Sequence, residues 1–495
     1  MCVNKFNLWV KLMAKLKFKR GRKVGDWQLV EKLGAGGNGD VWKVKNKNGD
    51  EFALKVLRNI DTDTFTRFKI EENILRELNI NGVIKLVDSF IPESKSEGTP
   101  WFVMRLAKSF DEYKQKVKDL DIVDDFVILG ETLRELHSRN IAHRDIKPEN
   151  LLHLDGRLVF TDFGLVKYPE RESLTPIKRD VGAKFTMAPE MRRFASKADG
   201  KAADVYSFAK SLWIALSGEA RGFDGQYVPN GILGLKNYHK DLYLKSLDDL
   251  LVIATDNDPD VRPSIHEFLV ELDTWLTLNR NFEQRNLREW FEIQSSLFPL
   301  GSPEQASWTN SDSIIMVIKE LSKSKSLNHM FFPDGGGHTV IDASKAHESG
   351  FIALHVSEKM VELIKPKKLT YESFGFDPSW DYFRLEADNV EPLEISNSIG
   401  YDNIAQELTE VYPGVYDNLS AWEYNEYEGK SLPDSARRVK RFLNGSFVFF
   451  CTESIYNQIR GKYDAYDAGH NKMTEFEFRQ FIKSGVDYVS SKESA

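Results

Sequence analysis

The feature that most constrains this 495-residue chain is a series of short motifs in fixed order between Leu33 and Arg262. In sequence order they are Gly34-Ala35-Gly36-Gly37-Asn38-Gly39-Asp40-Val41, Ala53-Leu54-Lys55, His143-Arg144-Asp145-Ile146-Lys147-Pro148-Glu149-Asn150, Asp162-Phe163-Gly164 and Ala188-Pro189-Glu190. A single glycine-rich motif is weak evidence, because such segments are often only flexible turns. The complete ordered set is specific, and it indicates one fold and one kind of chemistry.

The set resembles the signature motifs of the catalytic domain of eukaryotic-type protein serine/threonine kinases, over residues 27 to about 275. The resemblance implies an α+β, two-lobed kinase fold, with a small antiparallel β lobe plus one helix and a large, mainly helical lobe. The pattern of Asp145, one residue and then Lys147 is similar to that of serine/threonine kinases. The C-terminal part resembles no known family, and we expect it to form a separate α+β domain.

The resemblance implies that the ATP phosphates lie under a glycine-rich strand-turn-strand and against Lys55. Lys55 needs an anchor, and the register of the following helix favours Glu71 over the neighbouring Glu72. The glycines permit close approach of the backbone to the phosphates; they are Gly34, Gly36 and Gly39.

The resemblance assigns the chemistry of transfer to four polar residues. Asp145 is the expected catalytic base for the substrate hydroxyl, and Lys147 is expected to balance the charge of the transferring phosphate. Asn150 and Asp162 are the expected ligands of Mg²⁺, a hard cation that prefers oxygen ligands.

The resemblance also predicts an adenine pocket and an apolar link between the lobes. Met104 matches the gatekeeper and is followed by the hinge, in which Arg105 is expected to face solvent. The other residues of the pocket are Val41, Ala53, Leu106, Ala107 and Leu152, and those of the apolar link are Leu75, Leu86, His143 and Phe163.

Three further residues favour a protein kinase over a small-molecule kinase of related fold. Glu190 and Arg262 match an ion pair that closes the large lobe, and Asp204 matches the anchor of the catalytic loop.

One departure from the family pattern is Ala183, where serine/threonine kinases usually carry a hydroxyl that bridges the catalytic Asp and Lys. Ala183 therefore bears on substrate choice rather than on ATP binding.

Arg144 suggests control by phosphorylation, because an arginine at this position usually pairs with a phosphate in the activation segment. That segment offers Ser173, Thr175 and Thr186, and we expect autophosphorylation at Thr175 or, failing that, at Ser173. The alternative is that Arg144 is structural and the loop is ordered without modification.

Composition and charge bear on the compartment and the binding partners of the protein. Cys2 and Cys451 cannot form a disulfide framework, and no apolar run reaches the length of a membrane helix, so we expect a cytoplasmic protein. Residues 1–24 carry eight Lys or Arg and no acidic residue, so the net charge of −8 becomes −16 for residues 25–495. We therefore expect no nucleic-acid partner. The basic arm is interpreted as a solvated tail, as a helix attached to an anionic membrane surface, or, up to residue 12, as an over-extended start.

The predicted domains are the basic arm (1–24), the kinase domain (25–278), a helix and linker (279–312) and an accessory domain (313–495). Phe282–Ser296 is predicted to be an amphipathic helix with Leu287, Trp290 and Phe291 on one side. The linker is Ser295–Asp312, which is rich in Ser, Pro, Gly and Asn.

Within the accessory domain the sequence predicts a helix at Ser313–Ser322 and strands at Tyr382–Leu385 and Phe447–Cys451. Asp434–Leu443 is interpreted as a helix that ends at Asn444-Gly445, although this dipeptide is equally typical of a hairpin turn.

Several polar features of this domain favour structural roles. Asp464–Glu475 resembles an EF-hand loop in spacing, but Tyr466 and Ala468 replace two required ligands, which argues against calcium binding. The basic cluster Arg437, Arg438, Lys440 and Arg441 is interpreted as a solvated helix face. No metal-like partners are expected near His338 and His347.

The sequence therefore predicts a Mg·ATP-dependent protein serine/threonine kinase whose C-terminal domain recruits substrates or regulates activity. The alternative is a nucleotide-binding pseudokinase that signals through that domain. The presence of Lys55, Asp145, Asn150 and Asp162 together favours the enzyme, because pseudokinases usually lose at least one of them.

Overall fold

The computed structural model divides the chain into two compact units, Met1–Arg280 and Asn281–Ala495. It describes residues 18–35, 39–58, 61–93, 97–166, 185–193, 198–331, 337–357, 360–373, 381–396, 407–413, 415–417, 433–450 and 474–493. Several sequence predictions lie outside these ranges, namely those for residues 1–17, Gly36, Ser173, Thr175, Ala183, Cys451 and most of the EF-hand-like loop. No helix in the described ranges combines the length and the apolar character needed to cross a membrane.

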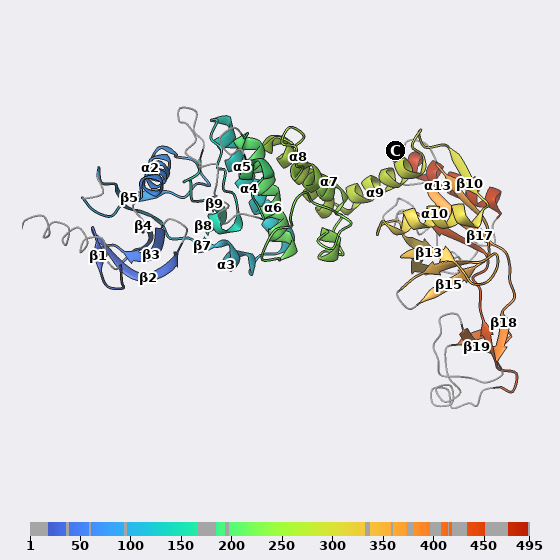
Figure 1. The fold of residues 1–495 in the computed structure, drawn as a ribbon. Helices are drawn as coiled ribbons and strands as arrows, with labels where there is room; N and C mark the ends of the chain where they lie inside the picture. Colours follow the sequence, from blue (N-terminus) through green and yellow to red (C-terminus); the bar gives the residue numbers. More distant parts are fainter. Residues whose placement is uncertain are drawn as a thin grey trace, which may run out of the picture. The chain divides into compact units, whose positions relative to one another are not determined.

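The small lobe of the first unit is an antiparallel sheet with one helix (Figure 1). Its strands pair in the order β1-β2-β3-β4-β6-β5. The bounds are β1 Lys23–Val24, β2 Trp27–Ala35, β3 Gly39–Lys45, β4 Glu51–Leu57, β5 Leu86–Phe90, β6 Trp101–Arg105 and α2 Thr62–Glu77. Asp61 caps α2 by accepting a hydrogen bond from the Thr64 amide. The buried residues Phe68, Glu71 and Leu75 of α2 are spaced by three and four, so one face of the helix lies against the lobe core.

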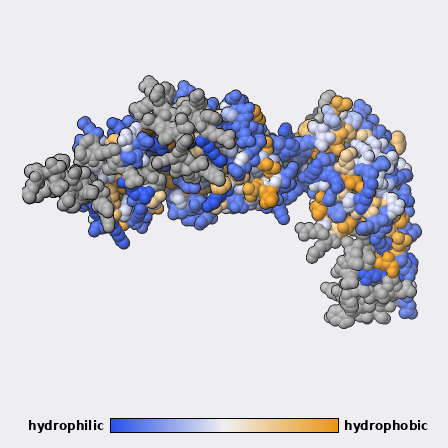
Figure 2. Space-filling model, in the orientation of Figure 1, coloured by the Kyte–Doolittle hydropathy of each residue, from blue (hydrophilic) through white to orange (hydrophobic). Residues whose placement is uncertain are grey.

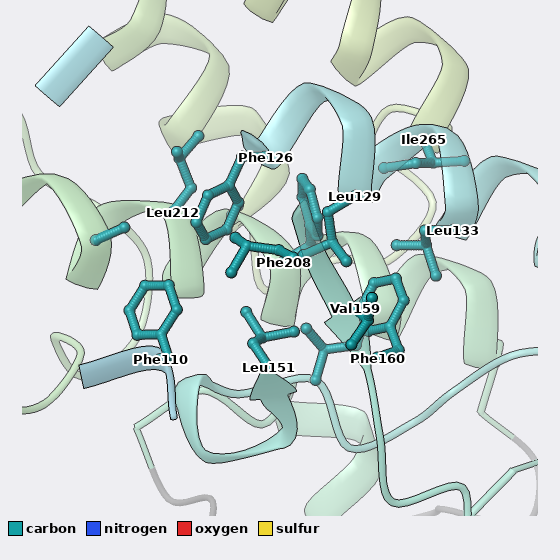
Figure 3. Packing of buried hydrophobic residues seen from close by; sticks show 14 of the residues in the cluster. Phe110, Phe126, Leu129, Leu133, Leu151, Val159, Phe160, Phe208, Leu212 and Ile265 are labelled. Carbon is teal, nitrogen blue, oxygen red and sulfur yellow. The ribbon is translucent and has the colours of Figure 1, made fainter. Parts of the chain in front are cut away.

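The large lobe is mainly helical. Its elements are β7 Lys108–Ser109, α3 Phe110–Lys114, α4 Asp119–Ser138, η1 Pro148–Asn150, β8 Leu151–Leu154, β9 Arg157–Phe160, α5 Pro189–Arg193, α6 Gly200–Ser217, η2 Leu235–Asn237, α7 Lys245–Ala254 and α8 Ile265–Arg280. Helix α6 is buried nearly all round, which is typical of a helix at the centre of a domain. Figure 3 shows Phe126 and Leu129 beside Phe208 in this core, where each buried side chain contributes about 1.5–3 kcal/mol.

The second unit holds one six-stranded sheet, two smaller sheets and three helices in its described part. The large sheet has the order β10-β16-β17-β22-β11-β12, and the smaller ones are β13-β14-β15 and β18-β21-β19-β20. The helices are α9 Phe282–Leu297, α10 Ser311–Ser322 and α13 Glu475–Glu493. The strands are β10 Gln305–Trp308, β11 His329–Phe331, β12 Gly337–Thr339, β13 Asp342–Lys345, β14 Ile352–His355, β15 Val361–Ile364, β16 Pro366–Glu372, β17 Tyr382–Ala387, β18 Leu393–Ser396, β19 Glu407–Tyr412, β20 Val415–Asp417, β21 Arg437–Lys440 and β22 Ser446–Phe449.

The two faces of the large sheet differ in chemistry because side chains alternate along a strand. Tyr371 and Phe383 belong to an apolar core shared with α9 and α10. The opposite face carries Glu372 and Tyr382, and it is covered by α13, whose Phe478 packs edge-on against Tyr382 with ring centroids 5.0 Å apart. Surface hydrophobic residues form separate patches among hydrophilic ones in the view of Figure 2.

The structure corrects two element predictions in this unit. The predicted helix at Asp434–Leu443 is wrong, because this segment contains β21, which pairs with β18 and β19. The predicted linker Ser295–Asp312 is also wrong in part, because it contains β10, which pairs with β16.

Side-chain predictions in the second unit also need correction. Phe291 is 52% exposed, so it does not share the buried face of Trp290 on α9. The basic cluster lies on and beside a strand, and Arg437 pairs with Glu410 at 2.7 Å instead of facing only solvent. As a separate observation, Nε2 of His338 lies 3.4 Å from Oε1 of Glu362, which is the distance of an ion pair.

Candidate active site

The first part of the site is the pairing of Lys55 on β4 with Glu71 on α2. Lys55 Nζ donates to Oε1 and Oε2 of Glu71 at 2.7 and 2.8 Å, and it lies 3.3 Å from Oδ1 of Asp162. Burial alone would lower the pKa of Lys55, but the charges of Asp162 and Glu71 outweigh it and the pKa is raised. Glu72 points elsewhere and pairs with Arg76, because successive helix residues differ in direction by about 100°. Lys55 is therefore a fixed cation.

Asp204 of α6 holds the catalytic loop, which precedes η1, in place. Its carboxylate accepts the amides of His143 and Arg144 at 2.7 and 2.6 Å, and the Nε2 of His137 lies 3.0 Å away. Arg144 has a φ of 66°, a left-handed conformation that is uncommon for a residue with a side chain. The two amide bonds to Asp204 fix this turn, and Asp145 follows it directly.

Asp145 lies at the centre of a small polar group. Its Oδ2 accepts from Lys147 Nζ at 2.8 Å and from the Asn150 side-chain amide at 2.9 Å. Burial raises the pKa of Asp145, while the positive charge of Lys147 opposes the shift. A buried carboxylate with two donors is held in one orientation, as a proton acceptor must be.

Asp162 and Phe163 follow β9, and their side chains point to different neighbours. Asp162 has a φ of 62° and faces Lys55, whose charge is the main cause of its lowered pKa. Phe163 is fully buried, and its ring centroid lies 4.6 Å from that of His143. This packing holds the Asp162 carboxylate, in its ionised form, in the site.

The residues predicted to line the adenine pocket come from both lobes. Ala53 and Met104 are opposite each other on β4 and β6, and Met104 is buried. Arg105 is exposed, as expected, and it forms an ion pair with Asp155. Val41, Leu86, Leu106, Ala107 and Leu152 are partly buried and pack against the same core, which also includes Leu75.

The glycine-rich segment is described at both ends. At Gly39 a Cβ atom would lie 2.6 Å from the Val56 carbonyl oxygen, so only glycine fits there. At Gly34 a Cβ atom would meet open space, so packing does not require glycine at that position.

A buried ion pair closes the large lobe away from the site. Arg262 Nη1 and Nη2 donate to the two carboxylate oxygens of Glu190 at 2.7 and 3.0 Å, and the Arg262 side chain is fully buried. The pair ties the helix α5 to the segment before α8.

The sequence analysis did not identify His137 as a third partner of Asp204, since a histidine near the end of an apolar helix gives no distinctive pattern.

Comparisons with known proteins agree with this geometry. The protein kinase domain model matches residues 27–271. The chain is 30% identical over 202 residues to the serine/threonine-protein kinase AtPK2/AtPK19 of Arabidopsis thaliana, covering 40% of this chain and 42% of that protein. It is 30% identical over 212 residues to the serine/threonine-protein kinase PknA of Mycobacterium tuberculosis, covering 41% and 48%.

The chain thus spans less than half the length of these relatives. Among solved structures, the kinase domain of PknI from Mycobacterium tuberculosis aligns with a TM-score of 0.40 and 22% identity, covering 52% of this chain and 99% of that one. The motifs, the paired side chains and the family match coincide on one segment. Residues 27–271 of this chain therefore form a protein kinase domain.

Proposed function

We propose that the chain transfers the γ-phosphate of ATP to serine or threonine hydroxyls of proteins. The observation that carries the proposal is the simultaneous presence of two assembled groups. Lys55 is paired with Glu71 beside Asp162, and Asp145 is held by Lys147 and Asn150. A kinase needs a positioned phosphate-binding cation and a positioned base, because catalysis of phosphoryl transfer is mostly positioning and charge stabilisation.

Each residue then has one task. Lys55 binds the α- and β-phosphates, and Glu71 keeps its ammonium group in place. Asp145 orients the substrate hydroxyl and accepts its proton, while Lys147 balances the charge of the transferred group. The backbone of the strands that carry Gly34 and Gly39 covers the phosphates, and the adenine lies between apolar side chains: Val41, Ala53, Met104, Leu106, Ala107 and Leu152.

The donor set at Asn150 and Asp162 fits Mg²⁺. A lowered pKa keeps Asp162 ionised, and the amide oxygen of Asn150 is a second hard ligand. The described residues contain no cluster of three or more His, Cys, Asp or Glu that could hold a metal alone, and Mg²⁺ commonly takes its remaining ligands from phosphates and water. Bound there, the metal would neutralise phosphate charge.

We further propose a cytoplasmic setting, autophosphorylation at Ser173 or Thr175, and a substrate-recruiting or regulatory role for residues 313–495. The absence of a spanning helix in the described part is compatible with such a setting. The basic arm 1–24 could add attachment to an anionic membrane surface. Ala183 bears on the choice of protein substrate rather than on ATP binding, since the bridging hydroxyl is missing.

The test is to incubate the purified full chain with γ-labelled ATP, Mg²⁺ and a serine/threonine peptide library, and to map products by mass spectrometry. Transfer to serine or threonine supports the proposal, and transfer that persists in Asp145→Asn contradicts the role of that residue. ATP binding without any transfer by the wild-type chain would instead favour the pseudokinase.

A further inference from the structure

Lys210 is a fully buried lysine of α6 that no step of the proposed transfer uses. Its Nζ donates to the Phe223 carbonyl oxygen at 2.8 Å. It also lies over the rings of Phe223 and Tyr206, 4.4 and 4.8 Å from their centroids. Burying a lysine is costly unless its ammonium group is well partnered, so these contacts mark a specific link between α6 and the segment after it.

The segment that Lys210 holds contacts the end of the activation segment. A Cβ atom at Gly222 would lie 2.6 Å from the Phe185 carbonyl oxygen, so the two backbones touch and only glycine fits. The guanidinium of Arg221 lies over the Phe185 ring, 5.7 Å from its centroid. Holding Phe223 in place therefore also holds Phe185 in place.

The stretch from Phe185 to Met191 is tied to the catalytic loop at its other end. Met191 Sδ lies 3.8 Å from Nη2 of Arg144, the residue before Asp145. A protein whose hydroxyl reaches Asp145 must lay its neighbouring residues over surfaces beside the catalytic loop. The stretch Phe185–Met191 is such a surface, because one of its ends contacts that loop.

We propose that Lys210 is a positioning residue that, through the Phe223 carbonyl, keeps Phe185–Met191 in the shape that receives the protein substrate. The inference rests on the proposed kinase function for the identity of the substrate. We expect Lys210 to affect binding of the protein substrate rather than of ATP, since the residues it contacts, Phe223 and Tyr206, are not among those assigned to ATP or Mg²⁺.

The first experiment separates the two substrates of the full-length protein. In Lys210→Met we expect the KM for a synthetic single-serine peptide, selected as a substrate of the wild-type chain, to rise about five-fold, as for a lost hydrogen bond. The KM for ATP and kcat should stay within about two-fold of wild type. The control is Lys245→Met, because Lys245 of α7 is an exposed lysine that pairs with Asp249 of the same helix at 2.8 Å.

The second experiment measures the link without catalysis. Hydrogen exchange followed by mass spectrometry should show faster exchange at residues 185–191 and 221–227 in Lys210→Met, and unchanged exchange there in Lys245→Met. Arg221→Ala is a second variant of the same link at an exposed side chain, so it is not expected to impair folding. It should also speed exchange at residues 185–191.

The outcomes separate this inference from the proposed function. A wild-type chain that transfers no phosphate refutes the proposed function, while hydrogen exchange still tests the link. Unchanged exchange at 185–191 in both Lys210→Met and Arg221→Ala overturns the inference. So does a rise in the KM for ATP equal to that for the peptide, because it would indicate general loss of structure.

Discussion

Asp145 and Asp162 are two carboxylates of one site whose pKa values are shifted in opposite directions. Burial raises the pKa of Asp145, whereas the charge of Lys55 lowers that of Asp162. Two carboxylates whose pKa values are shifted in opposite directions can have different roles in one site. The first suits a proton acceptor, and the second suits a permanently ionised ligand of a cation.

Asp145→Asn should reduce phosphate transfer by about 10²–10⁴-fold, the usual contribution of a general base. Binding of ATP should persist, because Asp145 acts on the hydroxyl of the acceptor. Transfer is measured with labelled ATP, and binding by the thermal shift that ATP produces. Asp249→Asn, at an exposed position of α7, is the control that should keep both. A fall in ATP affinity as large as the fall in rate would contradict this role.

Asp162→Ala should remove the Mg²⁺ dependence of ATP binding. The carboxylate is the charged member of the proposed ligand pair, and Asn150 alone offers one neutral oxygen. Thermal-shift titrations with ATP, with and without Mg²⁺, measure the effect in wild type and variant. If Mg²⁺ strengthened ATP binding equally in both proteins, Asp162 would not be a ligand.

At the scale of elements, α2 presents two adjacent buried glutamates in different directions, and only Glu71 meets Lys55. Glu71→Gln should lower kcat/KM about tenfold or more, since a charged hydrogen bond to Lys55 is lost. Glu72→Gln is the matched control and should leave kcat/KM near the wild-type value, although it too replaces a buried carboxylate. Equal losses in the two variants would mean that α2 as a whole, rather than Glu71, supports the site.

Burial of Lys210 in α6 makes the free energy of unfolding depend on pH. Burial lowers its pKa to about 7 in the folded protein, with Arg192 adding to the shift and Asp224 opposing it, against 10.5 for the ordinary group. Between these pH values the unfolded chain binds a proton that the folded chain does not, so the free energy of unfolding rises with pH. Relative to Lys210→Met, wild type should therefore gain stability from pH 7 to pH 9 in urea denaturation of the first unit. A difference that is independent of pH would show that Lys210 stays charged.

The elements also show how far a sequence carries a prediction. The resemblance carried by motifs of fixed spacing implies the small β lobe with its helix and the mainly helical large lobe around Lys55 and Asp145, and the structure contains both lobes. The segment at Asp434–Leu443 was predicted as a helix and contains β21, because cross-strand pairs such as Arg437 with Glu410 outweigh local preference.

The same limit applies within the site. Spacing indicates Glu71, Asn150 and Asp204, because each belongs to a motif or to a register. It gives no signal for the contact of Lys210 with the Phe223 carbonyl, since a backbone acceptor can belong to any residue. Contacts of this kind depend on how elements pack, and they become visible only in the folded chain.

At the scale of the whole molecule, the second unit depends on the attachment of its last helix. Arg479 of α13 donates to the buried carboxylate of Glu372, which also accepts from the Tyr382 hydroxyl at 2.6 Å. Arg479→Met should destabilise this unit by about 1–3 kcal/mol, because a buried charge loses its partner. Hydrogen exchange should rise along α13 and β16 and stay unchanged in residues 27–271. Lys483→Met, at an exposed position of α13, is the control, and an equal effect there would exclude a specific role of the Arg479–Glu372 pair.

The partners of the catalytic loop come late in the chain, and this sets an order of events during synthesis. The loop at His143 and Arg144 needs the carboxylate of Asp204, and Glu190 needs Arg262. A ribosome adds about 5–20 residues per second, so a nascent chain carries Asp145 for several seconds before Arg262 has been added. During that interval the polypeptide holds the motifs without the lobe that shapes them. Under the proposed function, a newly made chain therefore gains its assembled catalytic loop only after these later partners have been added.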